Sequence, residues 1–163
     1  MKRHFRWVLA ALVTVAAIGA GVGAWSLARG HDSGLPQISA YTEGTTTRVG
    51  PYLYCNIVDL NDCTKEPVQG QLSVSERYPV QLSVPTEISR APWRLLKVYS
   101  DERDTTTTSY RPGTQLAVTV PTVDPNRGRV VGLVVQLLTL VQDQNGELYD
   151  LPHAEWSVRL DWK

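Results

Sequence analysis

The amino-acid sequence predicts an all-β domain, an antiparallel β-sandwich, preceded by one apolar N-terminal helix. From Ile38 onward, short runs rich in Val, Thr, Leu, Tyr and Trp are separated by Pro, Gly, Asn and Asp, a pattern typical of short strands. No stretch after residue 30 repeats apolar residues with the helical period, and the many β-branched residues disfavour helix. Before this region, the 21 residues from Trp7 to Leu27 carry no charge.

The uncharged N-terminal run is long enough to cross a membrane. At 1.5 Å per residue, a helix over it would be about 30 Å long, which matches the hydrocarbon core of a bilayer. We therefore expect a transmembrane helix over residues 7–28 that acts as a signal anchor. A cleaved signal peptide is the alternative, although the apolar part of such a peptide usually has about 7–15 residues.

The flanking charges predict the orientation of this helix. Lys2, Arg3 and Arg6 precede it, and only Arg29 closely follows it. Because positive residues stay on the cytoplasmic side, residues 1–6 are expected in the cytoplasm and the rest of the chain outside. The expected location is the cell membrane, with a single span and an extracytoplasmic domain; cleavage would make the protein secreted.

Small residues form two rows within the expected helix. Gly19 and Gly23 make a G-x-x-x-G pair, and Ala16, Ala20 and Ala24 make a second row. Small residues four positions apart let two helix backbones approach closely, so this face is a candidate for packing on a partner helix. The alternative is that Gly and Ala are simply common in such segments.

Residues 29–37 are polar and contain Gly and Pro, which predicts a short linker to a domain over residues 38–163. The length of 163 residues allows one ordinary domain with an appendage. The strands expected in this domain are Ile38–Thr42, Thr45–Val49, Tyr52–Ile57, Gln71–Val74, Val80–Val84, Arg94–Ser100, Thr106–Tyr110, Gln115–Val120, Val130–Val141 and Glu155–Asp161.

Two segments give the clearest local predictions. In the expected strand near residue 95, Trp93 and Tyr99 share one face, which predicts a wall of rings. Asn145-Gly146 is a strong signal for a tight turn between the last two strands, since both residues tolerate positive φ. Turn signals at such short intervals favour an immunoglobulin-like sandwich, although the Cys…Trp…Cys spacing of true immunoglobulin domains is absent.

Composition and residue types exclude several functions. From Asp32 onward, 12 Lys and Arg stand against 16 Asp and Glu, a net charge of −4 without a basic stripe, which argues against nucleic-acid binding. His153 and Glu155 share a side of an extended chain and are candidates for a metal pair or for the base of a hydrolase. No third ligand is indicated by spacing, so we expect neither a metal, nor another cofactor, nor an enzyme.

Three groups of residues together carry a resemblance to a known family. They are Gly50-Pro51-Tyr52-Leu53-Tyr54-Cys55 with Asp62-Cys63, Val84-Pro85 with Ala91-Pro92-Trp93-Arg94, and His153-Ala154-Glu155-Trp156-Ser157-Val158. With these groups the chain resembles an actinobacterial, largely mycobacterial, family of exported or single-pass membrane proteins known only as a domain of unknown function. The resemblance implies a location in the cell envelope and no particular chemistry.

Cys55 and Cys63 are the only cysteines, and their compartment decides between a metal site, a redox centre and a disulfide. Outside an actinobacterial membrane the surroundings favour oxidation. Seven intervening residues do not make the C-x-x-C of redox enzymes, and no histidine stands nearby for zinc. We therefore expect a disulfide that closes a small loop.

These observations favour a non-enzymatic binding module, an accessory or stabilising subunit of a membrane protein complex in the cell envelope. Its expected partners are the lipid bilayer and a membrane protein, contacted through the helix and one sheet face. One alternative is a carrier or sensor of an apolar ligand such as a lipid, with Trp93, Tyr99, His153 and Trp156 as the candidate binding face. A hydrolase that uses His153 is the second alternative.

Overall fold

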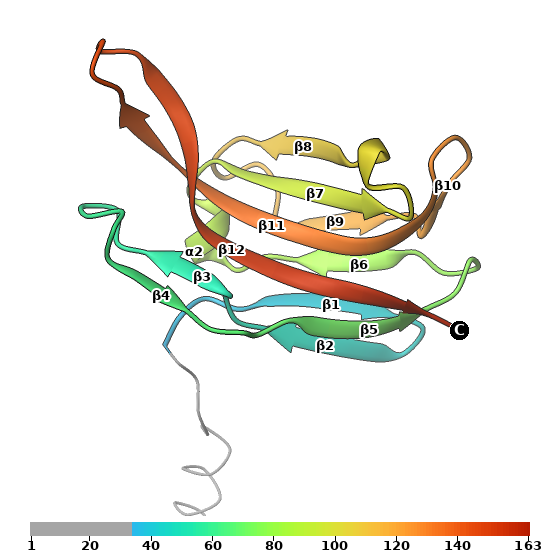
Figure 1. The fold of residues 1–163 in the computed structure, drawn as a ribbon. Coiled ribbons are helices and arrows are strands. Elements are labelled where there is room, and N and C mark those ends of the chain that lie inside the picture. Colours follow the sequence, from blue (N-terminus) through green and yellow to red (C-terminus); the bar gives the residue numbers. More distant parts are fainter. Residues whose placement is uncertain (1–33) are drawn as a thin grey trace, which may run out of the picture. The chain divides into compact units, whose positions relative to one another are not determined.

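The fold was obtained as a computed structural model, which describes residues 34–163. Nearly all regular structure in this part is strand (Figure 1). The strands are β1 (Ile38–Thr42), β2 (Thr45–Val49), β3 (Leu53–Cys55), β4 (Cys63–Lys65), β5 (Gly70–Val74), β6 (Val80–Ser83), β7 (Trp93–Tyr99), β8 (Thr106–Tyr110), β9 (Ala117–Val120), β10 (Val123–Asp124), β11 (Gly128–Gln142) and β12 (Leu148–Trp162). Two short helical turns, α2 (Thr86–Ser89) and η1 (Glu102–Asp104), lie in connections.

The strands form two sheets that face each other. The smaller sheet has the order β2-β1-β6-β9, and the larger has the order β4-β3-β12-β11-β7-β8. In the larger sheet, β10 also pairs with β11, and β5 also pairs with β12. The predicted all-β class is confirmed, and the pairing is antiparallel throughout the described strands except between β5 and β12, which run parallel.

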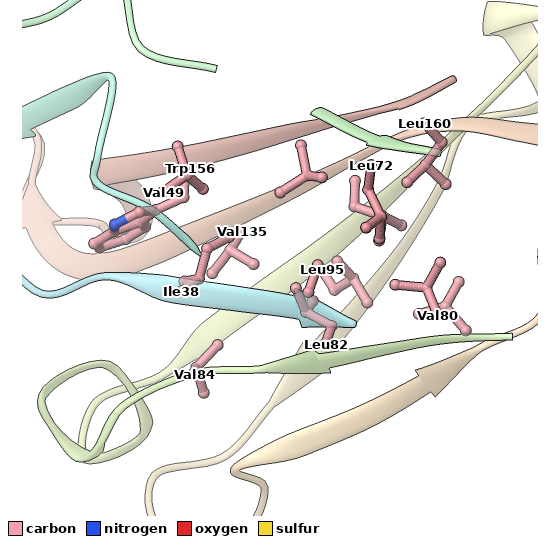
Figure 2. Close-up of a cluster of buried hydrophobic side chains, with 14 of the residues drawn as sticks. Ile38, Val49, Leu72, Val80, Leu82, Val84, Leu95, Val135, Trp156 and Leu160 are labelled. Carbon is pink, nitrogen blue, oxygen red and sulfur yellow. The ribbon is translucent and has the colours of Figure 1, made fainter. Parts of the chain in front are cut away.

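The core lies between the two sheets, and alternation along each strand fills it. In β12, Trp156, Val158 and Leu160 are buried and alternate with more exposed neighbours. Figure 2 shows Trp156 and Leu160 in one cluster with side chains from the small sheet, such as Ile38 and Leu82. Because both sheets contribute apolar side chains to the same cluster, the described strands form one domain.

Most predicted strands are present, with shifted ends. The last strand was expected from Glu155 but begins at Leu148, directly after the turn, so β11 and β12 form one long hairpin. The turn is confirmed near Asn145-Gly146, but only Gly146 has a positive φ, because Asp143 pairs with Glu147 around a three-residue loop. The short strands β4 and β10 were not predicted.

Gly70 begins β5 where there is no room for a side chain. A Cβ there would lie 3.3 Å from both Val158 Cγ2 and Val49 Cβ. We expect Gly70→Ala to lower the free energy of unfolding by about 1–3 kcal/mol through overpacking. Gly132 is the matched control, because its nearest neighbour would be Val98 Cβ at 3.7 Å. Urea denaturation should show Gly132→Ala close to the parent; equal losses in the two variants would contradict the packing argument.

The expected cytoplasmic segment, the transmembrane helix with Gly19, Gly23, Ala16 and Ala20, and most of the linker lie outside the described residues. Within residues 34–163, no helix is both long and apolar enough to cross a bilayer.

Candidate binding surface

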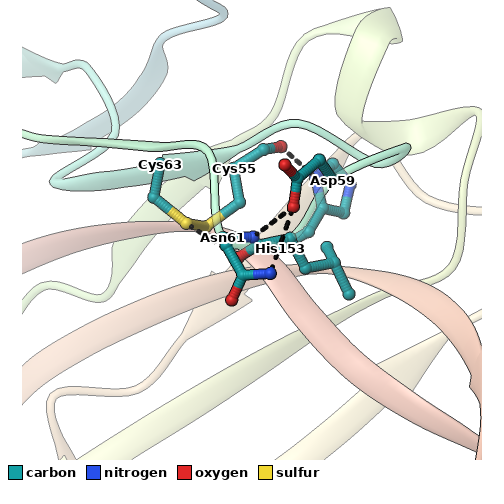
Figure 3. The surroundings of a disulfide bond; sticks show 6 residues. Cys55, Asp59, Asn61, Cys63 and His153 are labelled. Atoms are coloured by element: carbon teal, nitrogen blue, oxygen red, sulfur yellow. Dashed lines mark hydrogen bonds between the residues drawn. A yellow bond between two sulfur atoms is a disulfide. The ribbon is translucent and has the colours of Figure 1, made fainter.

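The disulfide expected between Cys55 and Cys63 is present (Figure 3). The two residues lie directly opposite each other in β3 and β4, so the bond closes the hairpin loop of residues 56–62. Within the loop, the Asn61 backbone N–H and side-chain amide both donate to the Asp59 carboxylate. The loop leaves Ile57 and Val58 in solvent, and Val58 is 90% exposed.

His153 lies beneath this loop and is buried. Its ring Nδ1 lies 3.3 Å from the carbonyl oxygen of Cys55, which can only accept the hydrogen bond (Figure 3). The ring of Tyr54 meets the histidine ring edge-on. Leu137 pairs with Ala154 and Leu138 with Pro152, so His153 is an extra residue of β12 at a β-bulge. These contacts give the histidine a structural role in seating the disulfide loop against β12.

Glu155 belongs to a separate polar row on the outer face of the large sheet. The Tyr52 hydroxyl and the Gln136 amide both donate to its carboxylate, and Arg94 Nε donates to Gln136 at 2.6 Å. Burial, and then the hydrogen bond and negative charge of Glu155, raise the pKa of the Tyr52 hydroxyl, which therefore stays protonated as the donor. Each carboxylate oxygen of Glu155 thus accepts one of these hydrogen bonds, and no hydrogen bond joins Glu155 to His153.

The three aromatic residues of the expected ligand face lie in the core. Trp93, Tyr99 and Trp156 are at most 1% exposed. Trp93 stacks on Tyr110 with the ring centres 4.2 Å apart, and the indole Nε1 of Trp156 donates to the carbonyl oxygen of Pro36 at 2.8 Å. These rings therefore fill the space between the sheets, and an apolar ligand bound by them would have to displace core side chains.

A shallow groove does lie on the outer side of β3. It has a volume of about 440 Å³ and is lined by Tyr52, Leu53, Lys65, Glu66 and Pro67. Its lining contains none of the four residues of the expected ligand face, so the groove does not support a carrier that binds an apolar ligand through those residues.

One end of the sandwich gathers exposed apolar side chains, and we call it the hairpin end. Here β1 begins, β6 ends and the β11–β12 hairpin projects beyond the neighbouring strands (Figure 1). Seven of the ten exposed large hydrophobic residues of the described chain lie at this end: Ile57, Val58, Leu116, Leu140, Leu148, Tyr149 and Leu151. Contiguous exposed apolar patches are a common feature of interaction surfaces, so this end is the candidate binding surface.

The projecting hairpin, residues 138–152, has no other strand beside it. Pairing with β7 ends at Leu137, and pairing with β3 ends at Ala154. A two-stranded ribbon alone is only marginally stable in water, so interactions within the turn are needed to stabilise the projecting hairpin. Asp143 does this: its carboxylate accepts the backbone N–H groups of Glu147 and Asn145, and these bonds hold its pKa below the usual range.

Both tips at the hairpin end are acidic. The hairpin contains Asp143, Glu147 and Asp150, and the disulfide loop contains Asp59 and Asp62. Neither segment contains a lysine or an arginine. The surface therefore combines exposed apolar side chains with negative charge on these two segments.

Sequence reasoning predicted the disulfide but missed the hairpin surface. The residues Leu148-Tyr149-Asp150-Leu151 did carry a signal, because they continue the alternation of β12 back to the turn. Pro152 concealed it, since a proline ordinarily argues against a strand.

Comparisons with known proteins agree on one family. The family model described as "Protein of unknown function (DUF2771)" matches residues 31–161. The chain is 64% identical over 160 residues to uncharacterized proteins of Mycobacterium bovis and of two strains of Mycobacterium tuberculosis, which covers 98% of this chain and 99% of each relative. No solved structure matches the chain. The resemblance to a mycobacterial family of unknown function is thereby confirmed.

Proposed function

The chain belongs to the DUF2771 family, whose function is unknown, so we propose a function from the sequence and geometry of this chain. The protein is a non-enzymatic, membrane-anchored extracytoplasmic binding module, and it serves as an accessory or stabilising subunit of a membrane protein complex in the cell envelope. The uncharged run from Trp7 to Leu27 supports the membrane anchor. In this proposal the domain on the extracytoplasmic side is an immunoglobulin-like sandwich.

The observation that carries this proposal is the position of the apolar side chains relative to the start of the sandwich. Pro36, through its hydrogen bond to Trp156, is fixed to the same half of the molecule as the hairpin. If the span ends near residue 28, the eight residues to Pro36 reach at most ~28 Å when fully extended. A sandwich anchored through so short a linker would have other membrane proteins within reach as partners.

Small residues in the expected span offer a second contact with such a partner. Gly19 and Gly23 would let the anchor pack closely against another transmembrane helix. The anchor and the hairpin end together would hold one partner at two points, so that each contact raises the effective concentration of the other.

The proposal is tested with the intact chain produced in a mycobacterial host. Membranes solubilised in mild detergent should yield the 18.1 kDa chain in a native complex well above its own mass. The double variant Gly19→Leu, Gly23→Leu should weaken that complex, whereas substitution of Val8 and Val15 by leucine should not, since Val8 and Val15 belong to neither small-residue row. A chain that is released into the medium, or that migrates alone in detergent, would sink the proposal.

A further inference from the structure

We propose that the free edge of β11 in the projecting hairpin, residues 139–142, binds an extended segment of a partner protein by strand addition, and that this segment is basic and apolar. The inference rests on the proposed function, because it names the surface and the chemistry through which the module holds its partner.

The backbone of β11 presents unused hydrogen-bonding groups along this edge. The Leu138 N–H donates to the Pro92 carbonyl, so Leu138 faces the side of β7. At the other end of the segment, the Asp143 N–H donates to Glu147 and so faces β12. Because the direction alternates along a strand, the N–H and C=O groups of Leu140 and Gln142 point off the free edge.

The opposite edge of the hairpin is closed to pairing. Pro152 lies opposite Leu138 and faces outward with no N–H to donate, and the bulge at His153 breaks the line of the strand. Asp150 adds a charge to the same edge. The segment Thr139-Leu140-Val141-Gln142 has neither a proline nor a charge. Of the two edges, only that of β11 lacks the features with which proteins prevent strand addition.

Side chains on both faces of the hairpin could then cover the added strand. Leu140 and Leu148 lie diagonally on one face and are 63% and 66% exposed. On the other face, Val141 lies directly opposite Tyr149, whose ring is half exposed. A partner strand beside β11 would bury part of this apolar surface. Successive side chains of that strand would point to opposite faces of the hairpin, so both apolar faces would gain contacts.

Charge selects the occupant of this edge. The five carboxylates of the hairpin and the disulfide loop would repel an anionic lipid surface, which prefers Lys and Arg. They would also repel a second copy of the same hairpin. A protein segment with Lys or Arg among apolar residues is attracted instead, and the attraction weakens with salt.

The test uses the intact chain in membranes of the mycobacterial host, with photoreactive benzoylphenylalanine placed at Tyr149. Tyr78, an exposed tyrosine away from the hairpin end, serves as the control position for the same probe. Mass spectrometry of the cross-linked product identifies the peptide that is captured. We expect a peptide of another protein with net positive charge from the Tyr149 probe and none of that peptide from the Tyr78 probe.

Two edge variants give a matched comparison within this assay. Leu140→Pro removes an outward N–H from the edge of β11, whereas Asp150→Pro, directly across the hairpin, alters only the edge of β12. Leu140→Pro should lower the yield of the cross-link at least about tenfold, and Asp150→Pro should leave it within about twofold. Leu140→Lys keeps the backbone intact and repels a basic segment, so it should reproduce the loss without any question of folding.

The inference is overturned if the Tyr149 probe cross-links only to lipid, to a second copy of this chain, or to an acidic peptide. It is also overturned if the yield of the cross-link is unchanged in both Leu140 variants, or if Asp150→Pro lowers the yield as much as Leu140→Pro does. If the detergent complex survives in Leu140→Pro with its cross-link unchanged, the proposed function stands and the edge is not its contact. If the unmodified chain forms no complex and captures no protein, both fail.

Discussion

Replacing Trp156 with alanine is expected to lower the free energy of unfolding of the sandwich by about 3–5 kcal/mol. The side chain is fully buried between the sheets, so its removal leaves a large cavity and also frees the Pro36 carbonyl from its hydrogen bond. Urea denaturation of the detergent-solubilised chain, followed by circular dichroism, measures the loss.

Trp156→Phe is the matched control for that substitution. Phenylalanine keeps most of the apolar volume but cannot donate to Pro36, so the expected loss is about 1–2 kcal/mol. A small effect of Trp156→Ala, similar to that of the phenylalanine variant, would show that the ring is not the central packing element that its burial implies.

Removing the disulfide by Cys55→Ser with Cys63→Ser is expected to lower the free energy of unfolding by about 2.5 kcal/mol. This figure follows from the entropy of closing a loop whose ends are eight residues apart, because the bond restricts the unfolded chain. The midpoint of urea denaturation should therefore fall while the fold of the core is kept.

Treatment of the parent with a reductant provides the control for the disulfide. Reduction should reproduce the loss seen in the double serine variant and should have no effect on that variant itself. If the reduced parent unfolds at the same urea concentration as the oxidised protein, loop closure contributes nothing measurable to stability.

Alternation in the sequence was enough to predict most strands, because each strand of a sandwich has one buried face. It could not tell which face of β7 enters the core. Leu96 and Val98 make the second face apolar as well, so the rings of Trp93 and Tyr99 were interpreted as a ligand wall when they are core side chains. The strands β4 and β10 are too short to show any period.

The candidate site was harder to predict for two physical reasons. The disulfide follows from spacing and compartment, which the sequence contains. The pairing of His153 with Glu155 depended on regular alternation, and the bulge at His153 removes that regularity. The projecting hairpin depends on where β7 and β3 end beside it, and such a relation between distant segments leaves no local pattern.

The position of β12 also governs the order in which the domain can be assembled. This strand is the last of the sandwich in sequence, yet it lies between β11 and both β3 and β5. In the large sheet β5 pairs with β12 alone, so Leu72 has no backbone partner there until Leu160 has been synthesised. A ribosome-bound chain that lacks β12 cannot complete its large sheet, and the long sequence separation of these pairs makes folding slow. Folding of the sandwich is therefore a late event in the life of each molecule, completed only after synthesis has reached its final strand.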